Sequence, residues 1–434
     1  MKLNKPIALI TALLLCFMAS ACQKAAEPEI SEEVDNSGTE ITLLNIKSEV
    51  SSQLEELAAQ YKTETGITVN IINVQSGVDA QATLKGYYLS DQMPDIIACE
   101  ASGFENWDGL LEDLSDQDWA SRTDAAYSDS TYGVIGFPYT TEAIGLAYNA
   151  DILNKAGIDP ASITGPESMK AAFETLDAKK NELGLTAVIG YCAEPTEVGW
   201  SAGNHIFGAY IDSGLDRADT QYIDLLNNGG QFDEERINAY SKMIEMFNQY
   251  SDPAVLTQPA YNDQVLGFAS GKYAFITQGS WIGATMTGDD SAEYEAAGNF
   301  EVGMLPYAFE EGMDTILTSA PSWWAIIKEG DVEASKAFLQ WCSEDSAQQI
   351  LVEKAGFVSP FKDCKYVASD PFAKVISSYI SAGKTSNWHW MQMPEGLGQN
   401  GFSNAFFNFA SGTTDAAGFV QELKDIATEW YSKL

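Results

Sequence analysis

The stretch ITLLNIKSEVSSQLEELAAQYKTETGITVNIINV constrains the fold more than any other part of the chain. Residues 41–46 are apolar and β-prone, and residues 67–74 alternate as a second strand. Between them Leu54 and Leu57 recur at helical spacing, and Gly66 ends the helix. A strand–helix–strand unit places its two strands parallel in one sheet through a right-handed crossover. The sequence therefore predicts α/β architecture.

Further helix and strand signals alternate along the rest of the chain. Helices are predicted over residues 79–92, 166–183, 235–250, 335–355 and 416–434, and strands over 93–100, 143–149 and 185–195. In open α/β sheets, ligands bind beyond the carboxyl ends of the strands. Polar or aromatic side chains follow several predicted strands, namely residues 47–49, Glu100, Glu194 and Trp281. We expect a site built from such strand ends.

The N-terminus indicates export. Two lysines precede an uncharged, mostly apolar run over residues 7–21, which is shorter than the roughly 20 residues of a membrane-spanning helix. We interpret residues 1–22 as a secretory signal. The MASAC stretch resembles a bacterial lipobox, which implies lipidation at Cys22; simple cleavage near Ala21 is the alternative. Residues 23–40 are polar and acidic, which predicts a flexible tether.

The acidic composition excludes whole classes of partner. The chain has 62 acidic and 24 basic residues, which gives a formal charge of −38. Phosphate binding needs a basic stripe, and none is visible, so a nucleic-acid partner is excluded. The same balance argues against binding an anionic membrane surface through charge.

The cysteines do not indicate a metal or redox site. Cys99, Cys192, Cys342 and Cys364 are widely spaced, and no C-x-x-C pair is present. Their spacing leaves two alternatives open, a Cys342–Cys364 disulfide and buried free thiols.

The sequence offers little catalytic chemistry. It has only two histidines, His205 and His389, and neither H-E-x-x-H nor G-x-S-x-G is present. The GLGQNG stretch at residues 396–401 matches a dinucleotide fingerprint but follows no evident strand, so we interpret it as a flexible loop. Paired carboxylates at strand ends suggest a glycoside hydrolase as one candidate activity. In a chain with 62 acidic residues, however, two carboxylates can face one cleft by chance. We therefore predict no catalytic residue, no cofactor and no metal.

The aromatic residues favour a carbohydrate cleft. Many of them lie in segments rich in Gly, Pro, Ser or Asn, namely Trp107, Tyr139, Trp200, Trp281, Trp323, Trp324, Trp388 and Trp390. Indoles present a flat apolar surface to the C–H face of a sugar ring, and carboxylates accept hydrogen bonds from its hydroxyls. Each aromatic alone favours packing, but together with the acids at strand ends they favour a sugar site.

Several segments together resemble extracellular solute-binding protein family 1, the carbohydrate-capturing lipoproteins of ABC importers that include maltose-binding protein. They are MPDIIACEASGFENWDGLLEDLSD, YGVIGFPYTTEAIGLAYNADILNKAGI, GKYAFITQGSW, and residues 302–309 and 323–360. The resemblance covers nearly the whole of residues 41–434.

The resemblance implies a two-lobed, periplasmic-binding-protein-like α/β fold of type II, with several chain crossings at the hinge. Each lobe is expected to hold a mostly parallel sheet flanked by helices. The expected lobe 1 comprises residues 41–139 and 313–343, and the expected lobe 2 comprises residues 140–312 and 344–434.

The resemblance also implies ligand-binding residues. Glu142 matches a family glutamate that bonds sugar hydroxyls at the first hinge crossing, Glu194 matches its Glu-Pro, and Trp281 matches its stacking tryptophan. The full set of expected ligand contacts is Glu49, Glu100, Tyr139, Glu142, Glu194, Trp281, Trp323, Trp324, Trp388 and Trp390. One of the Trp323–Trp324 pair is expected to face the cleft and one to pack.

The sequence thus predicts a lipid-anchored, monomeric, extracellular protein of a bacterial cell membrane. It is expected to bind an oligosaccharide and deliver it to ABC importer permease subunits. Three alternatives stay open: a non-sugar cargo such as a peptide or polyamine, a glycan-cleaving enzyme, and an adhesin that shares the fold.

Overall fold

The strand–helix–strand unit predicted from the sequence is present in the computed structural model. Strands β1 (Glu40–Asn45) and β2 (Thr68–Asn73) pair in parallel, and α1 (Ser51–Thr65) connects them. Helix α1 buries its leucines and ends at Gly66, whose φ of 81° lies in the left-handed region that favours glycine. The structure describes residues 38–75 and 78–434, so the predicted signal sequence, Cys22 and most of the tether lie outside the described residues.

The first sheet has six strands in the order β2–β1–β3–β12–β5–β4. Its other strands are β3 (Ile96–Cys99), β4 (Tyr127–Asp129), β5 (Gly133–Pro138) and β12 (Trp323–Ile326). Strands β2, β1 and β3 run parallel, whereas β12 is antiparallel to both β3 and β5. We call this sheet and its helices the first lobe.

The second sheet has four strands in the order β10–β7–β9–β8. They are β7 (Leu146–Asn149), β8 (Ala187–Gly190), β9 (Tyr273–Ile276) and β10 (Val302–Leu305). Only β8 and β9 pair in parallel. Both sheets are therefore mixed rather than mostly parallel, because the strands that follow the crossings enter each sheet in the opposite direction. We call this sheet and its helices the second lobe.

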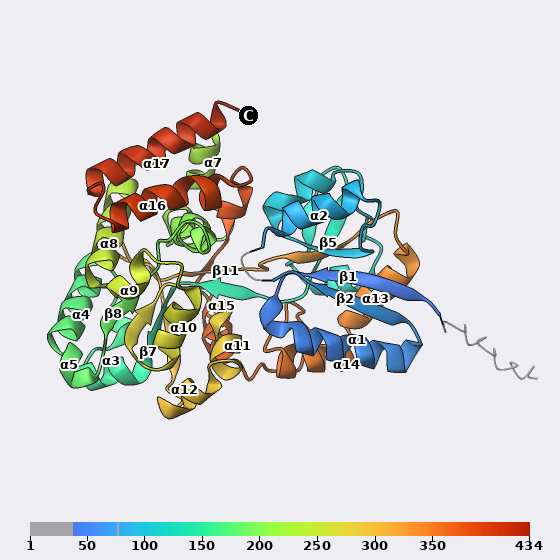
Figure 1. Ribbon diagram of the computed structural model, residues 1–434, viewed down its shortest axis with the longest axis horizontal. Coiled ribbons are helices and arrows are strands. Elements are labelled where there is room, and N and C mark those ends of the chain that lie inside the picture. Colours follow the sequence, from blue (N-terminus) through green and yellow to red (C-terminus); the bar gives the residue numbers. More distant parts are fainter. Residues whose placement is uncertain (1–37, 76–77) are drawn as a thin grey trace, which may run out of the picture. The chain divides into compact units, whose positions relative to one another are not determined.

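A third sheet of three short strands, β13–β11–β6, carries the chain between the two larger sheets. Strand β6 (Glu142–Ile144) follows β5 and leads into β7, and β11 (Ile316–Ser319) leads back into β12; β13 spans Thr385–Ser386. Figure 1 shows β11 between the elements of the first lobe and those of the second.

The predicted strand over residues 143–149 is split at Gly145 into β6 and β7, which belong to different sheets. A Cβ on Gly145 would lie 2.6 Å from the Met304 side chain and 2.7 Å from the Leu305 carbonyl oxygen. The close approach of β10 therefore requires glycine at the point where the chain changes sheet.

Helices flank both larger sheets (Figure 1). Those of the first lobe are α1, α2 (Ala80–Leu89), α13 (Val332–Cys342), α14 (Asp345–Gln349), η1 (Ser48–Val50), η2 (Ala101–Trp107), η3 (Asp118–Arg122) and the π-helix η6 (Ile350–Lys354). Those of the second lobe, up to its sheet's last strand, are α3 (Ala150–Ala156), η4 (Pro160–Ser162), α4 (Pro166–Ala178), α5 (Lys180–Leu183), η5 (Ser201–Ile206), α6 (Phe207–Asp212), α7 (Gln221–Asn227), α8 (Glu234–Tyr250), α9 (Pro253–Leu256), α10 (Tyr261–Ala269), α11 (Ile282–Thr287) and α12 (Ser291–Ala296). The C-terminal part adds α15 (Ala373–Ser381), η7 (His389–Gln392), η8 (Leu397–Phe402), α16 (Ser403–Ala410) and α17 (Ala416–Tyr431).

The core of the first lobe draws side chains from a segment that the sequence analysis assigned to lobe 2. Ala347, Leu351, Phe357 and Phe361 are buried in one cluster with Tyr61 of α1. The described chain from α14 to Phe361 therefore packs against the six-stranded sheet, because its apolar positions complete the surface that α1 leaves open.

Two further details differ from the sequence analysis or settle its alternatives. Cys99, Cys192, Cys342 and Cys364 are free thiols, so no Cys342–Cys364 disulfide is formed. Residues 397–401 of the predicted flexible loop form most of the π-helix η8, and Gly396 precedes it.

Candidate functional site

A charged cluster lies at the carboxyl end of β1. The Lys47 ammonium is 2.6 Å from Glu142 Oε1 and 2.9 Å from Glu49 Oε1. The side chains of Lys47 and Glu142 are only 12% and 9% exposed. Since an unpaired buried charge costs several kcal/mol, Lys47 explains how a carboxylate can stand at the start of the buried strand β6. The pair also ties the first lobe to a crossing strand.

The cluster keeps one ammonium between two carboxylates. Burial alone would lower the pKa of Lys47, but the adjoining Glu142 and Glu49 raise it well above its ordinary value. Burial raises the pKa of the Glu142 carboxyl, and the attraction of Lys47 only partly offsets that rise. Lys47 therefore carries its charge throughout the physiological pH range.

A further carboxylate, Glu100, follows β3 and has no ion-pair partner in the described part of the chain. Glu100 is exposed to solvent, but the surrounding protein atoms displace part of the water around its carboxyl. This partial loss of hydration raises the pKa of Glu100 to about 7; the charge of Lys47 opposes the rise, and the charges of Glu142 and Asp79 add to it. Glu100 can therefore be neutral or charged near neutral pH.

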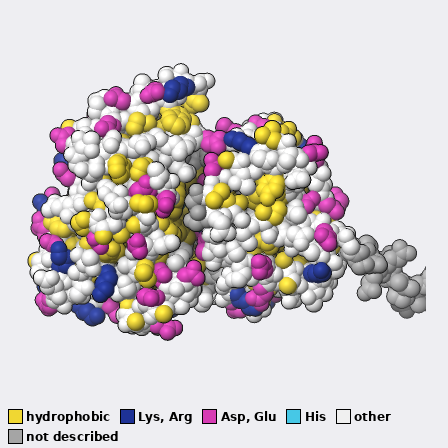
Figure 2. All heavy atoms as spheres, in the orientation of Figure 1, with side chains coloured by type: hydrophobic (Ala, Val, Ile, Leu, Met, Phe, Trp, Pro, Cys, Tyr) yellow, Lys and Arg dark blue, Asp and Glu magenta, His cyan; other side chains and the backbone are white. Residues whose placement is uncertain are grey.

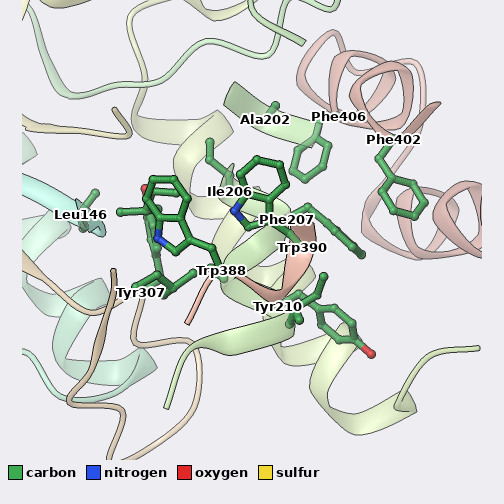
Figure 3. Packing of buried hydrophobic residues seen from close by; sticks show 14 of the residues in the cluster. Leu146, Ala202, Ile206, Phe207, Tyr210, Tyr307, Trp388, Trp390, Phe402 and Phe406 are labelled. Atoms are coloured by element: carbon green, nitrogen blue, oxygen red, sulfur yellow. The ribbon is translucent and has the colours of Figure 1, made fainter. Parts of the chain in front are cut away.

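The second lobe contributes a cluster of aromatic rings, which we call the aromatic cluster and define as Trp200, His205, Trp281, Trp388 and Trp390. The ring of His205 lies at its centre, with centroid distances of 5.2 Å to Trp200, 4.8 Å to Trp281, 5.7 Å to Trp388 and 5.1 Å to Trp390. Trp388 and Trp390 are 3% and 4% exposed, and the other three rings are half-buried. Figure 3 shows the two indoles near Ile206 and Phe207.

The charged cluster and the aromatic cluster meet at a small cavity. Lys47, Glu142 and Trp281 line this space of about 30 Å³, together with Glu49. Burial lowers the pKa of His205 to about 3, and the charge of Lys47 adds to that effect. His205 is therefore a neutral imidazole at physiological pH.

A much larger cavity, of about 1330 Å³, extends from the aromatic cluster. Thr141 lines both cavities, and Trp388 lines the larger one. Its other aromatic lining residues are Tyr127 and Trp323 of the first lobe, His389 of η7, and Trp430 and Tyr431 of α17. The volume and the aromatic walls are of the kind that holds a small-molecule ligand.

The cations of the larger cavity are already engaged. The Lys362 ammonium lies 2.6 Å from Asp124 Oδ1, and Arg217 donates hydrogen bonds to the carbonyl oxygens of Thr318 and Ser386. Glu105 and Asp216 also line the cavity and form no ion pair within the described residues. Asp124 therefore offsets the charge of Lys362, whereas Arg217 forms no ion pair among the described residues and is the cation that this cavity presents.

A buried His389–Asp212 pair holds the segment that carries Trp388 and Trp390. Asp212 accepts hydrogen bonds from the His389 backbone N–H at 2.8 Å and from Nδ1 at 2.6 Å. Burial raises the pKa of Asp212 to about 6, although His389 opposes that rise. Because Asp212 ends α6, the pair fixes η7 against the helix that follows His205.

The structure brings some of the predicted ligand residues together. Glu49, Glu142 and Trp281 line the small cavity, and Trp281, Trp388 and Trp390 share the aromatic cluster. Glu100 lies close enough to Lys47 and Glu142 for their charges to shift its pKa.

Other predicted ligand residues lie elsewhere. The rings of Tyr139 and Trp324 stack on each other in the core of the first lobe, and both are at most 1% exposed, so neither offers a free face to a ligand. Trp323 lines the large cavity, although its Nε1 donates to the Ala125 carbonyl oxygen. Glu194 is buried in a turn, where it accepts from the backbone N–H groups of Thr196 and Glu197.

Sequence reasoning missed His205 and Tyr261 as site residues, and it named Lys47 among the polar strand-end positions without making it a ligand contact. His205 was weighed only as a catalytic group. A signal was available for Lys47, because a buried carboxylate at Glu142 requires a cation nearby. Tyr261 has its ring centroid 5.7 Å from that of Trp200, but it begins a regular helix and looks like a core residue.

The described residues contain no group of three or more His, Cys, Asp or Glu side chains placed to hold a metal ion. Among the helices of residues 38–434 that the structure describes, none has the length and hydropathy to span a membrane.

The fold is shared with solved sugar-binding structures. RafE of Streptococcus pneumoniae, solved in complex with raffinose, is 21% identical with a TM-score of 0.70 over 90% of this chain and 99% of that one. A sugar transporter of Bacillus licheniformis in complex with stachyose is 17% identical with a TM-score of 0.68, and the match covers 89% of this chain and 98% of that one. A chitin oligosaccharide binding protein is 18% identical with a TM-score of 0.70 over 92% and 100%. At these identities the likeness shows the two-lobed fold.

The family is shown by sequence. A search of curated protein sequences found no match. The family model described as bacterial extracellular solute-binding protein matches residues 56–375, which is well over half of the chain. The chain is therefore a member of the bacterial extracellular solute-binding proteins.

Proposed function

We propose that this protein is the substrate-binding component of a carbohydrate ABC importer, which captures an oligosaccharide between its lobes and delivers it to a membrane permease. The observation that carries the proposal is the meeting of the two clusters. Trp281 of the aromatic cluster lines the same cavity as Lys47 and Glu142. Stacking rings next to charged hydrogen-bonding groups suit a ligand with apolar faces and hydroxyl edges.

The relatives support a carbohydrate as the cargo. Similar folds were solved with raffinose and with stachyose, and a third belongs to a chitin oligosaccharide binding protein. The cavity of about 1330 Å³ is large enough for several sugar rings.

The charges around the cavity favour a neutral cargo over an acidic one. Lys47 and Lys362 are paired with carboxylates, and Arg217 is bonded to backbone carbonyls. Among the described residues, a ligand carboxylate would meet one unpaired cation, Arg217, against two unpaired acids, Glu105 and Asp216, that line the same cavity. The same unpaired acids favour a polyamine as the second candidate cargo.

The rest of the proposed function concerns the cell. We propose a monomer that performs no chemistry and is held at the extracellular face of the membrane by a lipid on Cys22, which becomes the N-terminal residue when the signal sequence before it is cleaved. Permease subunits of the importer are the proposed partners. Metabolic labelling of the full chain with a palmitate analogue, compared with Cys22→Ser, tests the anchor; equal labelling of both would overturn it.

A thermal-shift screen of residues 23–434 tests the cargo. Raffinose, stachyose, malto-oligosaccharides and chitin oligosaccharides are compared with peptides and spermidine. A ligand at 100 times its dissociation constant stabilises the folded state by about 2.7 kcal/mol, which is readily visible. We expect a shift with an oligosaccharide and no cleavage of it. A shift with spermidine alone would overturn the sugar proposal, and a cleaved glycan would make the protein an enzyme.

A further inference from the structure

The aromatic cluster contains buried polar atoms without a hydrogen-bond partner in the described part of the chain. They are His205 Nδ1, Trp388 Nε1 and Trp390 Nε1. Trp281 Nε1 is also buried without a hydrogen bond of normal geometry. We leave it out of this set because the Tyr261 hydroxyl lies close enough to interact with it.

Proteins pair nearly all buried polar atoms with protein groups or ordered water. Among the described residues, Trp119 Nε1 and Trp324 Nε1 are also unpaired, in the core of the first lobe. In the aromatic cluster, however, the three unpaired atoms belong to neighbouring rings next to the large cavity, which points to a missing occupant.

The three orphaned atoms belong to rings that touch. The centroid of His205 lies 5.7 Å from that of Trp388 and 5.1 Å from that of Trp390, and the two indoles are 6.0 Å apart. Both indoles are more than nine-tenths buried, and Trp388 lines the large cavity. Figure 3 shows Trp388 and Trp390 beside Ile206, the residue next to His205. Of the three residues only Trp388 lines this cavity, so an occupant would reach the cluster past its ring.

The chemistry of the orphaned atoms restricts the occupant. An indole N–H can only donate, so an ammonium group, which also only donates, cannot satisfy Trp388 or Trp390. A carboxylate could accept from both indoles, but it cannot donate, so it leaves His205 unpaired in the tautomer whose Nδ1 is an acceptor. A neutral imidazole nitrogen either donates or accepts, according to its tautomer. A hydroxyl group both donates and accepts, so it fits all three atoms and either tautomer.

We propose that His205, together with Trp388 and Trp390, recognises a hydroxyl group of the bound oligosaccharide and makes His205 a specificity-determining residue. This inference rests on the proposed function, since it assumes that the cargo is a sugar. A sugar that lacks the hydroxyl at this place would leave the buried nitrogens unpaired. Sites of this kind discriminate strongly against such analogues.

The two histidines allow a direct test on residues 23–434. The sequence contains only His205 and His389, so ¹⁵N-histidine labelling gives two imidazoles. The spectrum of His205→Phe assigns them, because it keeps only the His389 signals. Raffinose, stachyose, maltotetraose, cellotetraose and the chitin tetramer are added in turn as probes. We expect the His205 Nδ1 resonance to move with a probe that binds, and to move more than the Nδ1 resonance of His389, which also lines the large cavity but is already bonded to Asp212.

Affinity supplies the second readout. His205→Phe keeps a ring of similar shape but has no nitrogen, and we expect it to weaken binding about tenfold, the effect of one lost hydrogen bond, without lowering the melting temperature. If His205→Phe does not fold, His205→Gln is measured instead; its amide both donates and accepts, so we expect it to keep most of the affinity.

The outcomes separate this inference from the proposed function. A probe that binds without moving the His205 signal, and with equal affinity for His205→Phe, would overturn the inference alone; ordered water would then satisfy the three atoms. A protein that binds no probe would overturn the proposed function together with the inference.

Discussion

Removal of Lys47 is expected to cost much more stability than neutralisation of its partner Glu142, although both changes break the same ion pair. Glu142 has Lys47 as its one described cation, at 2.6 Å, whereas Lys47 also contacts Glu49 at 2.9 Å. Lys47→Met therefore leaves a buried carboxylate uncompensated, which costs about 3–5 kcal/mol. Glu142→Gln leaves Lys47 paired with Glu49 and removes only a charge-assisted hydrogen bond, which costs about 1.5–3 kcal/mol.

Urea unfolding of the two single variants and of the double variant Lys47→Met/Glu142→Gln measures this asymmetry. The double variant should regain much of the loss of Lys47→Met, because its buried carboxylate is gone. In Lys47→Met the pKa of Glu142 should rise further above its unfolded value. Its folded state then binds more protons than its unfolded state, so its stability should fall as pH rises from 5 to 8. Equal losses in the two single variants, or a loss in Lys47→Met that is independent of pH, would refute this reasoning.

Three further predictions concern the proposed site. Trp281→Ala should weaken oligosaccharide binding, measured by calorimetry, by roughly 1–3 kcal/mol with little change in melting temperature. The control Trp341→Ala, at a half-buried indole of the first lobe, should not change the affinity. If Trp281→Ala binds the oligosaccharide as tightly as the unchanged protein, Trp281 is not part of the site. Glu100→Gln should raise the melting temperature at pH 8 but not at pH 5, because the raised pKa of Glu100 penalises its charged form; no gain at pH 8 would contradict this. Asp212→Asn should increase acrylamide quenching of tryptophan fluorescence, because the amide keeps only one of the two oxygens that accept from His389; unchanged quenching would mean that the pair does not position Trp388.

The fold was largely predictable because its signals are local. The periodicity of residues 41–74 and the glycine at Gly66 gave the first strand–helix–strand unit with nearly its observed bounds. The sequence could not show that Gly145 breaks one apolar run into strands of two sheets, because the reason is the approach of Met304 and Leu305 from far along the chain. Local patterns also could not place Phe357 in the first lobe, since its partners on α1 are distant in sequence.

The site was less predictable, because the role of a side chain depends on what covers it. Tyr139 and Trp324 look like stacking residues in sequence, but they stack on each other in a core. Glu194 follows a strand as expected, yet its carboxylate is used by the turn behind it. His205 gave no signal at all, because a lone histidine in a helical segment is usually a packing residue.

The aromatic half of the site is held in place by the second lobe. The π-helix η5 carries His205, and its wide turn packs against η8 so closely that a Cβ on Gly203 would lie 2.0 Å from the Gly398 carbonyl oxygen. Such turns are frequent at functional sites. Asp212 then fixes the segment that carries Trp388. Ring positions that the fold already fixes cost a ligand little ordering entropy.

The charged half, by contrast, joins Lys47 of the first lobe to the crossing strand β6. A ligand that bridges the two halves, as proposed, would stabilise their arrangement through the contacts that it makes only when both are in place.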